Sequence, residues 1–374
     1  MPMNSNTCPN QKILYIGGFE LPDKNAAAQR VVGIAKALRE LGYSVCFLNS
    51  LKNFGEKEQI KKEYFGFECY EYQRENEYDY LFKAKTVLSK IATIKPDIIF
   101  AYNYPAFALD KIRKYCVLNH IRCYADATEW YQAFGSNPIY RIIKNVDTRH
   151  RMKVVHKRLD GVIAISRYLY DYYNNCVNTV IIPPTVDISE EKWSISTEYN
   201  DNVVTFVYAG SPSAQKEKLD LIVSVIERIP SSCAILLNVV GVSAEQFLQM
   251  YGCNIVSSNR VKFWGRVEHR KVIEIIKQSD WSILLRENNK VVQAGFPTKL
   301  VESISCGTPV IVNDFSNIKD YLDETNSIMV SEILDIDKAV SKAINSSIQI
   351  RKDIFDYHQY MNQLKELLSN VECG

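Results

Sequence analysis

Apolar and polar positions follow two alternating spacings along the 374 residues. Short β-branched runs typical of strands alternate with stretches in which apolar residues return every three or four positions, the spacing of a helix with one buried face. This alternation predicts an α/β fold, with parallel sheets that carry helices on both faces. The predicted strands are 12–16, 43–48, 97–101, 121–125, 161–165, 179–182, 203–208, 234–240, 261–264, 281–285, 309–313 and 327–330, and the clearest helices are 26–41, 219–229, 268–278 and 298–306.

Two sets of strands and helices are separated by a polar stretch, DISEEKWSISTEYNDN, at 187–202. We therefore predict two Rossmann-like domains, at 1–188 and 200–350, because a chain of this length exceeds one typical domain. Residues 351–374 are predicted to form a C-terminal helix that packs back toward the first domain. A cleft between two doubly wound domains is the expected ligand site.

Composition narrows the possible functions. Hydrophobic residues make up 47% and charged residues 24%, and the formal net charge is only +2, so the balance argues against nucleic-acid binding. No apolar run approaches the ~20 residues of a membrane span, and MPMNSNTCPNQK lacks the apolar core of a secretory signal. The ten cysteines are scattered without a CxxC pair, as in a reducing compartment. A cytoplasmic location is expected.

The segment AGFPTKLVES, at 294–303, predicts a ligand site. Pro297 suits the start of a helix, and Gly295 lets the backbone approach a ligand closely. The free N–H groups of the first helical turn attract an anion, and Lys299 adds a positive charge. Glu302 lies one turn further along, where a carboxylate would face a hydroxyl-rich group. A sugar nucleotide has both an anion and such hydroxyls.

Several segments in this order resemble the family-4 retaining glycosyltransferases, whose GT-B fold consists of two facing Rossmann-like domains. The segments are GGFELPDKNAAAQRVVGIAKALRELGYSV (17–45), LDGVIAISRYL (159–169), VIIPPTVD (180–187), VYAGSPSAQKEKLDLI (207–222), VKFWGRV (261–267), SDWSILLR (279–286) and AGFPTKLVESISCGTPVI (294–311). The resemblance implies an acceptor-binding N-terminal domain and a C-terminal domain that binds a nucleotide-sugar donor.

The sequence departs from the family pattern at two places. The family has two glutamates separated by seven residues, and here Ala294 stands in place of the first one. The resemblance therefore carries ribose binding over to Glu302 but no sugar contact to Ala294. Ser211 stands where an arginine is usual, and Arg266 or Arg286 would compensate. Lys216 matches the family's lysine.

The donor-binding prediction comprises residues of the glycine-rich first loop, the loop after 203–208, the residue Arg266 after strand 261–264, and the segment that opens helix 298–306. Its residues are Gly17, Gly18, Gly210, Ser211, Lys216, Arg266, Gly295, Phe296, Pro297, Thr298, Lys299 and Glu302. Lys216 is also a catalytic candidate, because a cation near the departing pyrophosphate stabilises the transition state. The alternative for Lys216 is a solvated surface lysine, and for Glu302 an exposed helix position.

Asp126 and Glu129 are the catalytic candidates of the first domain. They follow the strand 121–125 in CYADATEWY, and the carboxyl ends of parallel strands favour catalytic groups. Either carboxylate would orient the donor sugar or the acceptor hydroxyl. Alternatively, Asp126 or Thr128 caps the following helix.

The run RIIKNVDTRHRMKVVHKR, at 141–158, holds seven basic residues and one acidic residue. A solvated helix face is one interpretation, and docking on an anionic membrane surface is the other. The five histidines form no metal-ligand spacing, and DID at 335–337 suits a helix cap, so no metal site is expected.

The sequence predicts a metal-independent retaining glycosyltransferase that needs no cofactor. It would move a sugar from a nucleotide donor to a glycan or lipid-linked acceptor, in surface polysaccharide assembly. Two alternatives stay open: a non-catalytic carbohydrate-binding subunit with this fold, which the missing first glutamate favours, and a sugar-nucleotide epimerase. No GxGxxG follows a strand, which argues against a dinucleotide dehydrogenase.

Overall fold

The computed structural model describes residues 11–22, 25–51, 60–74, 78–130, 138–195, 202–211, 217–230, 232–252 and 259–369. The chain forms two compact units, here called unit 1 (1–185 and 357–374) and unit 2 (186–356). The first crossing between the units therefore lies between Thr185 and Val186, and the second between Asp356 and Tyr357.

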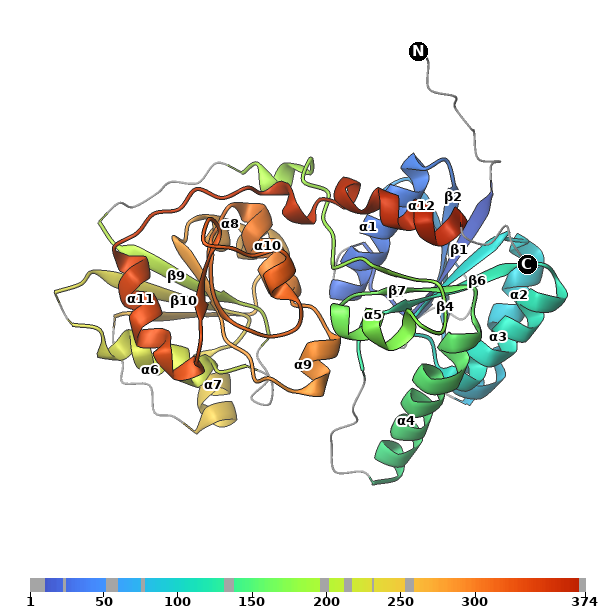
Figure 1. The fold of residues 1–374 in the computed structure, drawn as a ribbon, viewed down its shortest axis with the longest axis horizontal. Coiled ribbons are helices and arrows are strands. Elements are labelled where there is room, and N and C mark those ends of the chain that lie inside the picture. Colours follow the sequence, from blue (N-terminus) through green and yellow to red (C-terminus); the bar gives the residue numbers. More distant parts are fainter. Residues whose placement is uncertain are drawn as a thin grey trace, which may run out of the picture. The chain divides into compact units, whose positions relative to one another are not determined.

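Unit 1 contains an eight-stranded sheet in the order β3-β4-β2-β1-β5-β6-β7-β8. All neighbouring strands are parallel except β3 and β4, which pair antiparallel at one edge. Helices α1 and α12 cover one face of this sheet, and α2 and α3 cover the other (Figure 1). The strands are β1 (Lys12–Gly17), β2 (Ser44–Leu51), β3 (Ile60–Tyr64), β4 (Phe67–Gln73), β5 (Ile98–Tyr102), β6 (Arg122–Ala127), β7 (Gly161–Ala164) and β8 (Thr179–Ile181), and the helices are α1 (Ala26–Glu40), α2 (Lys85–Ile94), α3 (Ala106–Leu118), α4 (Pro138–His150), α5 (Arg167–Tyr173) and α12 (Met361–Ser369).

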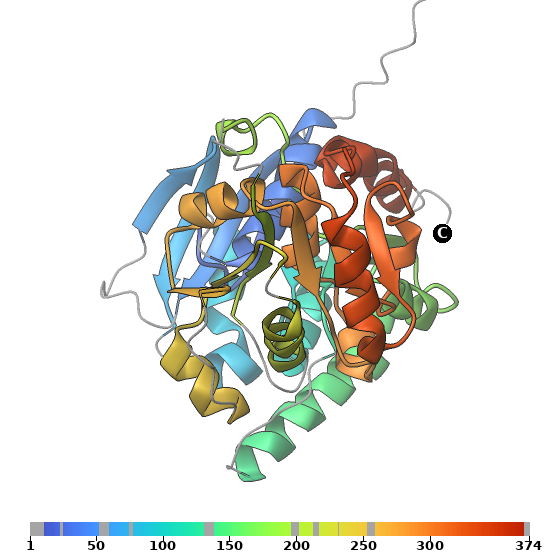
Figure 2. The ribbon, with the colours of Figure 1, turned by 90° about the vertical axis from the view of Figure 1, so that its left-hand side faces the viewer.

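Unit 2 contains a six-stranded parallel sheet in the order β11-β10-β9-β12-β13-β14, the arrangement of a classical dinucleotide-binding fold. Helices α8 and α10 cover one face, while α6, α7 and α11 lie on the other (Figures 1 and 2). The strands are β9 (Val204–Ala209), β10 (Ile235–Val240), β11 (Val261–Gly265), β12 (Trp281–Leu284), β13 (Val310–Asn313) and β14 (Ser327–Val330), and the helices are α6 (Leu219–Arg228), α7 (Ala244–Tyr251), α8 (His269–Lys277), α9 (Lys290–Ala294), α10 (Thr298–Cys306) and α11 (Ile336–Ile344).

The core of unit 1 is built on a row of aromatic side chains that crosses four strands. Phe47, Tyr15, Phe100 and Tyr124 occupy matching positions on β2, β1, β5 and β6. Tyr15 and Phe100 stack with ring centroids 5.6 Å apart, and Phe100 and Tyr124 stack at 5.2 Å. All four rings are fully buried, so their apolar area and ring contacts both stabilise the sheet.

All twelve predicted strands and the α/β class are confirmed, and β3 and β4 were missed. Strand β3 is an edge strand whose three central residues are exposed, so its sequence IKKEY carries no apolar signal. Strand β4 alternates between buried and exposed residues over FECYEYQ, a weaker signal than a continuous apolar run.

The prediction that residues 351–374 form one helix is wrong for residues 351–360, and residues 370–374 lie outside the described ranges. The α-helix begins only at Met361, after short 3-10 turns. Val186 donates its N–H to the carbonyl of Phe355, and the Asp356 carboxylate accepts the N–H of Ile188 at 2.9 Å. Asp356 is extended and pairs with Val186, so the chain cannot continue as a helix through this residue. Helix α12 itself packs against α1 and β8 within unit 1.

The basic run 141–158 is not one regular helix. Helix α4 ends at His150, and a π-helical turn (Arg151–Val155) and a 3-10 turn (His156–Arg158) follow. The wider turn places Arg151 in the interior, where it is 5% exposed and donates to the carbonyl of Asn103 at 3.0 Å. Arg151 is therefore unable to contact a membrane, although the sequence groups it with the other basic residues.

Candidate functional site

Four side chains at the carboxyl ends of the unit 2 strands form what we call the Glu217 cluster: Tyr208, Glu217, Arg286 and Lys299. Tyr208 lies near the end of β9, and Arg286 follows β12, the strand beside β9. The sheet order reverses between these two strands. In open α/β sheets, ligands bind at such a reversal, outside the carboxyl ends of the strands.

The carboxylate of Glu217 contacts the other three members of this cluster. Its Oε2 accepts from Lys299 Nζ at 2.7 Å and from the Tyr208 hydroxyl, and its Oε1 accepts from Arg286 at 2.9 Å. Lys299 also donates to the Tyr208 hydroxyl at 2.6 Å. The side chain of Glu217 is 4% exposed, whereas those of Lys299 and Arg286 are 15% and 14% exposed. The anion is thus enclosed, and both cations reach the surface.

Charge in this cluster is unbalanced, since two cations share one carboxylate. Burial opposes ionisation of Glu217, but Lys299 and Arg286 outweigh it and lower the pKa of that carboxyl below its usual value. Burial lowers the pKa of Lys299 to about 8, although Glu217 acts in the opposite direction. At neutral pH the cluster therefore keeps one net positive charge, as a site for an anion requires.

Gly210 makes room for Lys299. Its φ is +129°, which a residue with a side chain rarely adopts, and a Cβ here would lie 2.3 Å from Lys299 Cε. A Cβ on Gly241, after β10, would lie 2.6 Å from the backbone of Gly210. Gly210 and Gly241 thus leave room for the Lys299 side chain at the end of β9. Of the two glycines, only Gly210 was among the predicted site residues.

Helix α10 carries Lys299 and Glu302 on the same face, three residues apart. Glu302 is partly exposed, and its Oε1 lies 3.0 Å from Nε2 of His269, the first residue of α8. Pro297 is the residue before the helix rather than its first residue. Phe296 is 7% exposed and packs edge-on against Tyr321 at 5.3 Å, so it anchors the loop to the interior.

The other predicted residues of unit 2 lie in different places. Arg266 is exposed after β11, the edge strand of the sheet, while Arg286 is the arginine that joins the cluster. Ser211 is exposed after β9, and Ala294, which the sequence predicts to replace the family's first glutamate, is fully buried. Lys216 lies outside the described residues, so its predicted role stays a prediction.

Asp126 in unit 1 is fully buried in an ion pair. It contacts Arg30 Nη2 at 2.7 Å and accepts from the Tyr15 hydroxyl at 2.5 Å, and Arg30 also donates to the carbonyl of Ile182 at 2.9 Å. These partners come from β1, α1 and the end of β8. Asp126 therefore joins three parts of the unit and does not cap the helix after it. The catalytic role of Asp126 stays a prediction. The burial of its carboxylate argues against contact with a substrate.

The remaining candidates of unit 1 lie nearer the surface. Glu129 is partly buried after β6, Gly17 ends β1 and is buried, and Gly18 is exposed. Thr128, the other suggested helix cap, donates its N–H to the Asn103 side chain at 3.1 Å. Asp126 and Glu129 thus belong to different environments, although only three residues separate them.

Within the described ranges, no three His, Cys, Asp or Glu side chains group closely enough to hold a metal ion. In the same part of the chain, no helix combines the length and apolar character needed to cross a bilayer.

The order of the unit 2 strands places the cationic Glu217 cluster where open α/β sheets bind their ligands, beside the helix that carries Lys299 and Glu302. Residues 189–362 match the family model of glycosyl transferases group 1. That match covers 189–356 of unit 2 and includes all four members of the Glu217 cluster. No curated protein matches the sequence.

Solved structures extend the likeness to both units. Sucrose-phosphate synthase from Thermosynechococcus elongatus is 14% identical with a TM-score of 0.70, over 96% of this chain and 99% of that chain. The catalytic domain of starch synthase IV from Arabidopsis thaliana, bound to ADP and acarbose, is 11% identical with a TM-score of 0.67, over 97% and 99%. HepE from Anabaena, in complex with UDP-glucose, is 15% identical with a TM-score of 0.64, over 96% and 100%. The fold is therefore GT-B, with two Rossmann-like domains.

Proposed function

We propose that this protein transfers a sugar, with retention of configuration, from a nucleotide-sugar donor to a glycan or lipid-linked acceptor. The observation that carries the proposal is the Glu217 cluster, in which Lys299 and Arg286 present an excess positive charge at the reversal of the sheet order. The structural neighbour crystallised with UDP-glucose makes this compound the first donor to try.

Cleavage of the bond between the anomeric carbon and the donor phosphate leaves a nucleoside diphosphate with added negative charge. Lys299 and Arg286 are held by Glu217 before any ligand arrives, so they need no rearrangement to stabilise that charge. The acceptor oxygen bonds to the same carbon, and its proton passes to the departing phosphate oxygen. We propose that these two side chains supply the positive charge without a metal ion.

The donor's ribose would lie beside Glu302. A carboxylate that accepts from two ribose hydroxyls forms charge-assisted hydrogen bonds, which are stronger than neutral ones. His269, 3.0 Å from Glu302, would hold the carboxylate in place. This positioning residue escaped notice in the sequence because a lone histidine at the start of a helix fits no ligand spacing.

A screen of nucleotide sugars tests the proposed function. The protein should release UDP, GDP or ADP from one of the corresponding sugar donors, and a chelator should leave that rate unchanged. Release of the nucleotide would eliminate the non-catalytic subunit, and conversion of the sugar on an intact nucleotide would indicate the epimerase. If every donor stays intact and no nucleotide raises the melting temperature, the proposal fails.

We also propose that α4 docks on an anionic membrane surface, and one specific observation favours this. Ile139, Ile142, Ile143 and Val146 repeat at helical spacing and are 68%, 63%, 41% and 50% exposed. Helix α4 extends away from the sheet of its own unit (Figure 1). Such an apolar stripe enters the boundary between headgroups and acyl chains, and basic neighbours attract anionic lipid. The exposed basic side chains are Arg141, Arg149, Lys153 and Arg158.

Sedimentation with vesicles tests this docking. The wild type should bind vesicles that contain phosphatidylserine, and Ile142→Ser with Val146→Ser should abolish binding. Leu334→Ser is the matched control, because this leucine is 80% exposed in unit 2. Arg141→Gln with Arg149→Gln should reduce binding mainly at low salt, since the Debye length is about 10 Å at 0.1 M. A wild type that stays in solution at low salt would contradict the docking, and the acceptor would then be sought among soluble glycans.

A further inference from the structure

Unit 1 contains a cavity of about 270 Å³ that none of the predicted site residues lines. One wall is the end of β4 and the residue that follows it, Arg74. The opposite wall is the π-helical turn Asp79–Lys83 with the start of α2, and Tyr104, after β5, also lines the cavity. Its volume is close to the lower end of small-molecule sites, roughly 300–1,000 Å³. It suits one small ligand, or the terminal unit of a larger one.

The cavity lies where a parallel sheet binds its ligands, outside the carboxyl ends of its strands. A chain of hydrogen bonds connects it to the predicted glycine loop. Arg74 Nη2 donates to Ser50 Oγ at 3.2 Å, and Ser50 Oγ donates to the carbonyl of Gly17 at 3.1 Å. The cavity thus adjoins the loop at which the sheet order of unit 1 reverses, between β1 and β5.

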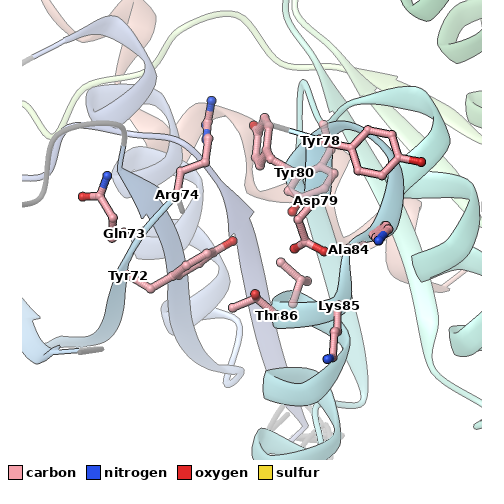
Figure 3. A pocket seen from close by; sticks show the side chains of 12 residues that line it. Tyr72, Gln73, Arg74, Tyr78, Asp79, Tyr80, Ala84, Lys85 and Thr86 are labelled. Carbon is pink, nitrogen blue, oxygen red and sulfur yellow. The ribbon is translucent and has the colours of Figure 1, made fainter. Parts of the chain in front are cut away.

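Aromatic side chains form much of the lining, with Tyr72, Tyr78, Tyr80 and Tyr104 all present. The Tyr72 hydroxyl and the Asp79 carboxylate point toward one another across the hollow (Figure 3). Burial raises the pKa of Tyr72 well above its usual value, so its hydroxyl stays protonated and able to donate. The two groups together offer a donor and an acceptor to the hydroxyls of a ring held between the tyrosines.

Basic residues outnumber acidic ones in the lining. Arg74, Lys83 and Lys85 face a single carboxylate, Asp79. The guanidinium of Arg74 lies 3.4 Å from the centre of the Tyr80 ring, and its bond to Ser50 fixes it further. A stacked, hydrogen-bonded arginine is preorganised and loses little freedom when it binds an anion.

From this lining we infer that the cavity is the acceptor subsite and that it takes a sugar unit bearing an anionic group, a phosphate or a carboxylate. The ring would lie against the tyrosines, with its anion at Arg74. Calling this cavity an acceptor subsite rests on the proposed function. The predicted binding of an anionic sugar does not depend on sugar transfer.

Calorimetric titration of the full chain tests the subsite. Glucose 6-phosphate and glucuronate are the anionic sugar probes. Glucose, which lacks the anion, and inorganic phosphate, which lacks the sugar, are the comparison ligands. We expect at least one anionic sugar to bind at least tenfold more tightly than either glucose or phosphate. The tighter of the two probes then identifies the anion as phosphate or carboxylate. Equal affinity for glucose and both anionic sugars, or for phosphate and glucose 6-phosphate, would overturn the inference.

Variants assign the binding to this cavity. Arg74→Gln should weaken the anionic probe at least tenfold, and Tyr78→Ala should weaken it severalfold. If Arg74→Gln fails to fold, Lys83→Gln with Lys85→Gln removes two exposed charges of the lining instead, and an unchanged affinity there would refute the assignment. Lys111→Gln, an exposed lysine on α3, is the matched control. If the same preparation binds a nucleotide but no anionic sugar, only the subsite is overturned. If it binds an anionic sugar but no nucleotide, only the proposed transfer is overturned.

Discussion

The two units each bury a carboxylate with a tyrosine and at least one cation, yet the two clusters differ in ways that matter for function. Asp126 pairs with one cation, Arg30, and the two side chains are 0% and 2% exposed. Glu217 pairs with two cations, and both are about 15% exposed. The first cluster is neutral and closed, whereas the second keeps a net positive charge within reach of a ligand. Charge balance and exposure, rather than residue type, therefore distinguish the two clusters, and they make only the Glu217 cluster a candidate for anion binding.

Asp126→Ala should have the largest effect, on stability. It would leave the Arg30 guanidinium buried without its anion, which typically costs about 3–5 kcal/mol. Urea denaturation followed by circular dichroism would measure the lost free energy of unfolding, and Arg30→Met with Asp126→Leu should recover much of it. Asp353→Ala, which removes an exposed partner of Arg351, should change it little. If Asp126→Asn folds with unchanged stability but abolishes transfer, Asp126 contacts the substrate as the sequence suggested, and the contrast between the clusters fails.

Lys299→Met should chiefly affect catalysis. Turnover should fall by about 10²-fold, as when one preorganised donor to a developing anion is lost. Stability should change less than with Asp126→Ala, because Glu217 retains its contact with Arg286. Steady-state kinetics beside a melting curve would separate the two quantities. Lys342→Met on α11 is the control, and wild-type turnover in Lys299→Met would exclude this lysine from the site.

Donor affinity should fall about tenfold between pH 7 and pH 9, because a lysine with a pKa of about 8 changes from about 90% to about 10% cationic over that range. The sign follows from the anion: the diphosphate needs the protonated amine, which is present below the pKa and lost above it. Glu217→Gln should move the midpoint to lower pH, since the carboxylate raises the pKa of Lys299. Titration of UDP, or of whichever nucleotide binds, would record the profile, and equal affinity at both pH values would contradict it.

Glu302→Gln should have the smallest effect of the four. Replacing charge-assisted hydrogen bonds to the ribose with neutral ones should weaken nucleotide binding about fivefold, or about 1 kcal/mol. Calorimetry with the nucleotide and with its deoxyribose analogue would measure the loss, which should shrink when the ribose hydroxyl is absent. Glu274→Gln on α8 is the control. If the affinity is unchanged, Glu302 does not contact the nucleotide, and the ligand site is confined to the Glu217 cluster.

The sequence alone predicted twelve of the fourteen strands in the described residues, because apolar periodicity reflects which residues must be buried. It also predicts that Lys299 and Glu302 contact a ligand, since the residues that open α10 are typical of a ligand site at a helix start. The sequence did not predict edge strand β3, because an exposed strand needs no apolar face.

Only the tertiary structure decided which charges are partners. Glu217 stands in the polar run QKEK and resembles a surface residue, yet the fold brings it to Lys299, 82 residues away. Asp126 meets Arg30 across 96 residues, and the π-helical turn after α4 places Arg151 in the interior. The periodic burial of apolar residues is local, so it can be recognised from residues that are close together in the sequence. The pairing of buried charges depends on contacts between distant segments, so their roles emerge only when the chain is folded.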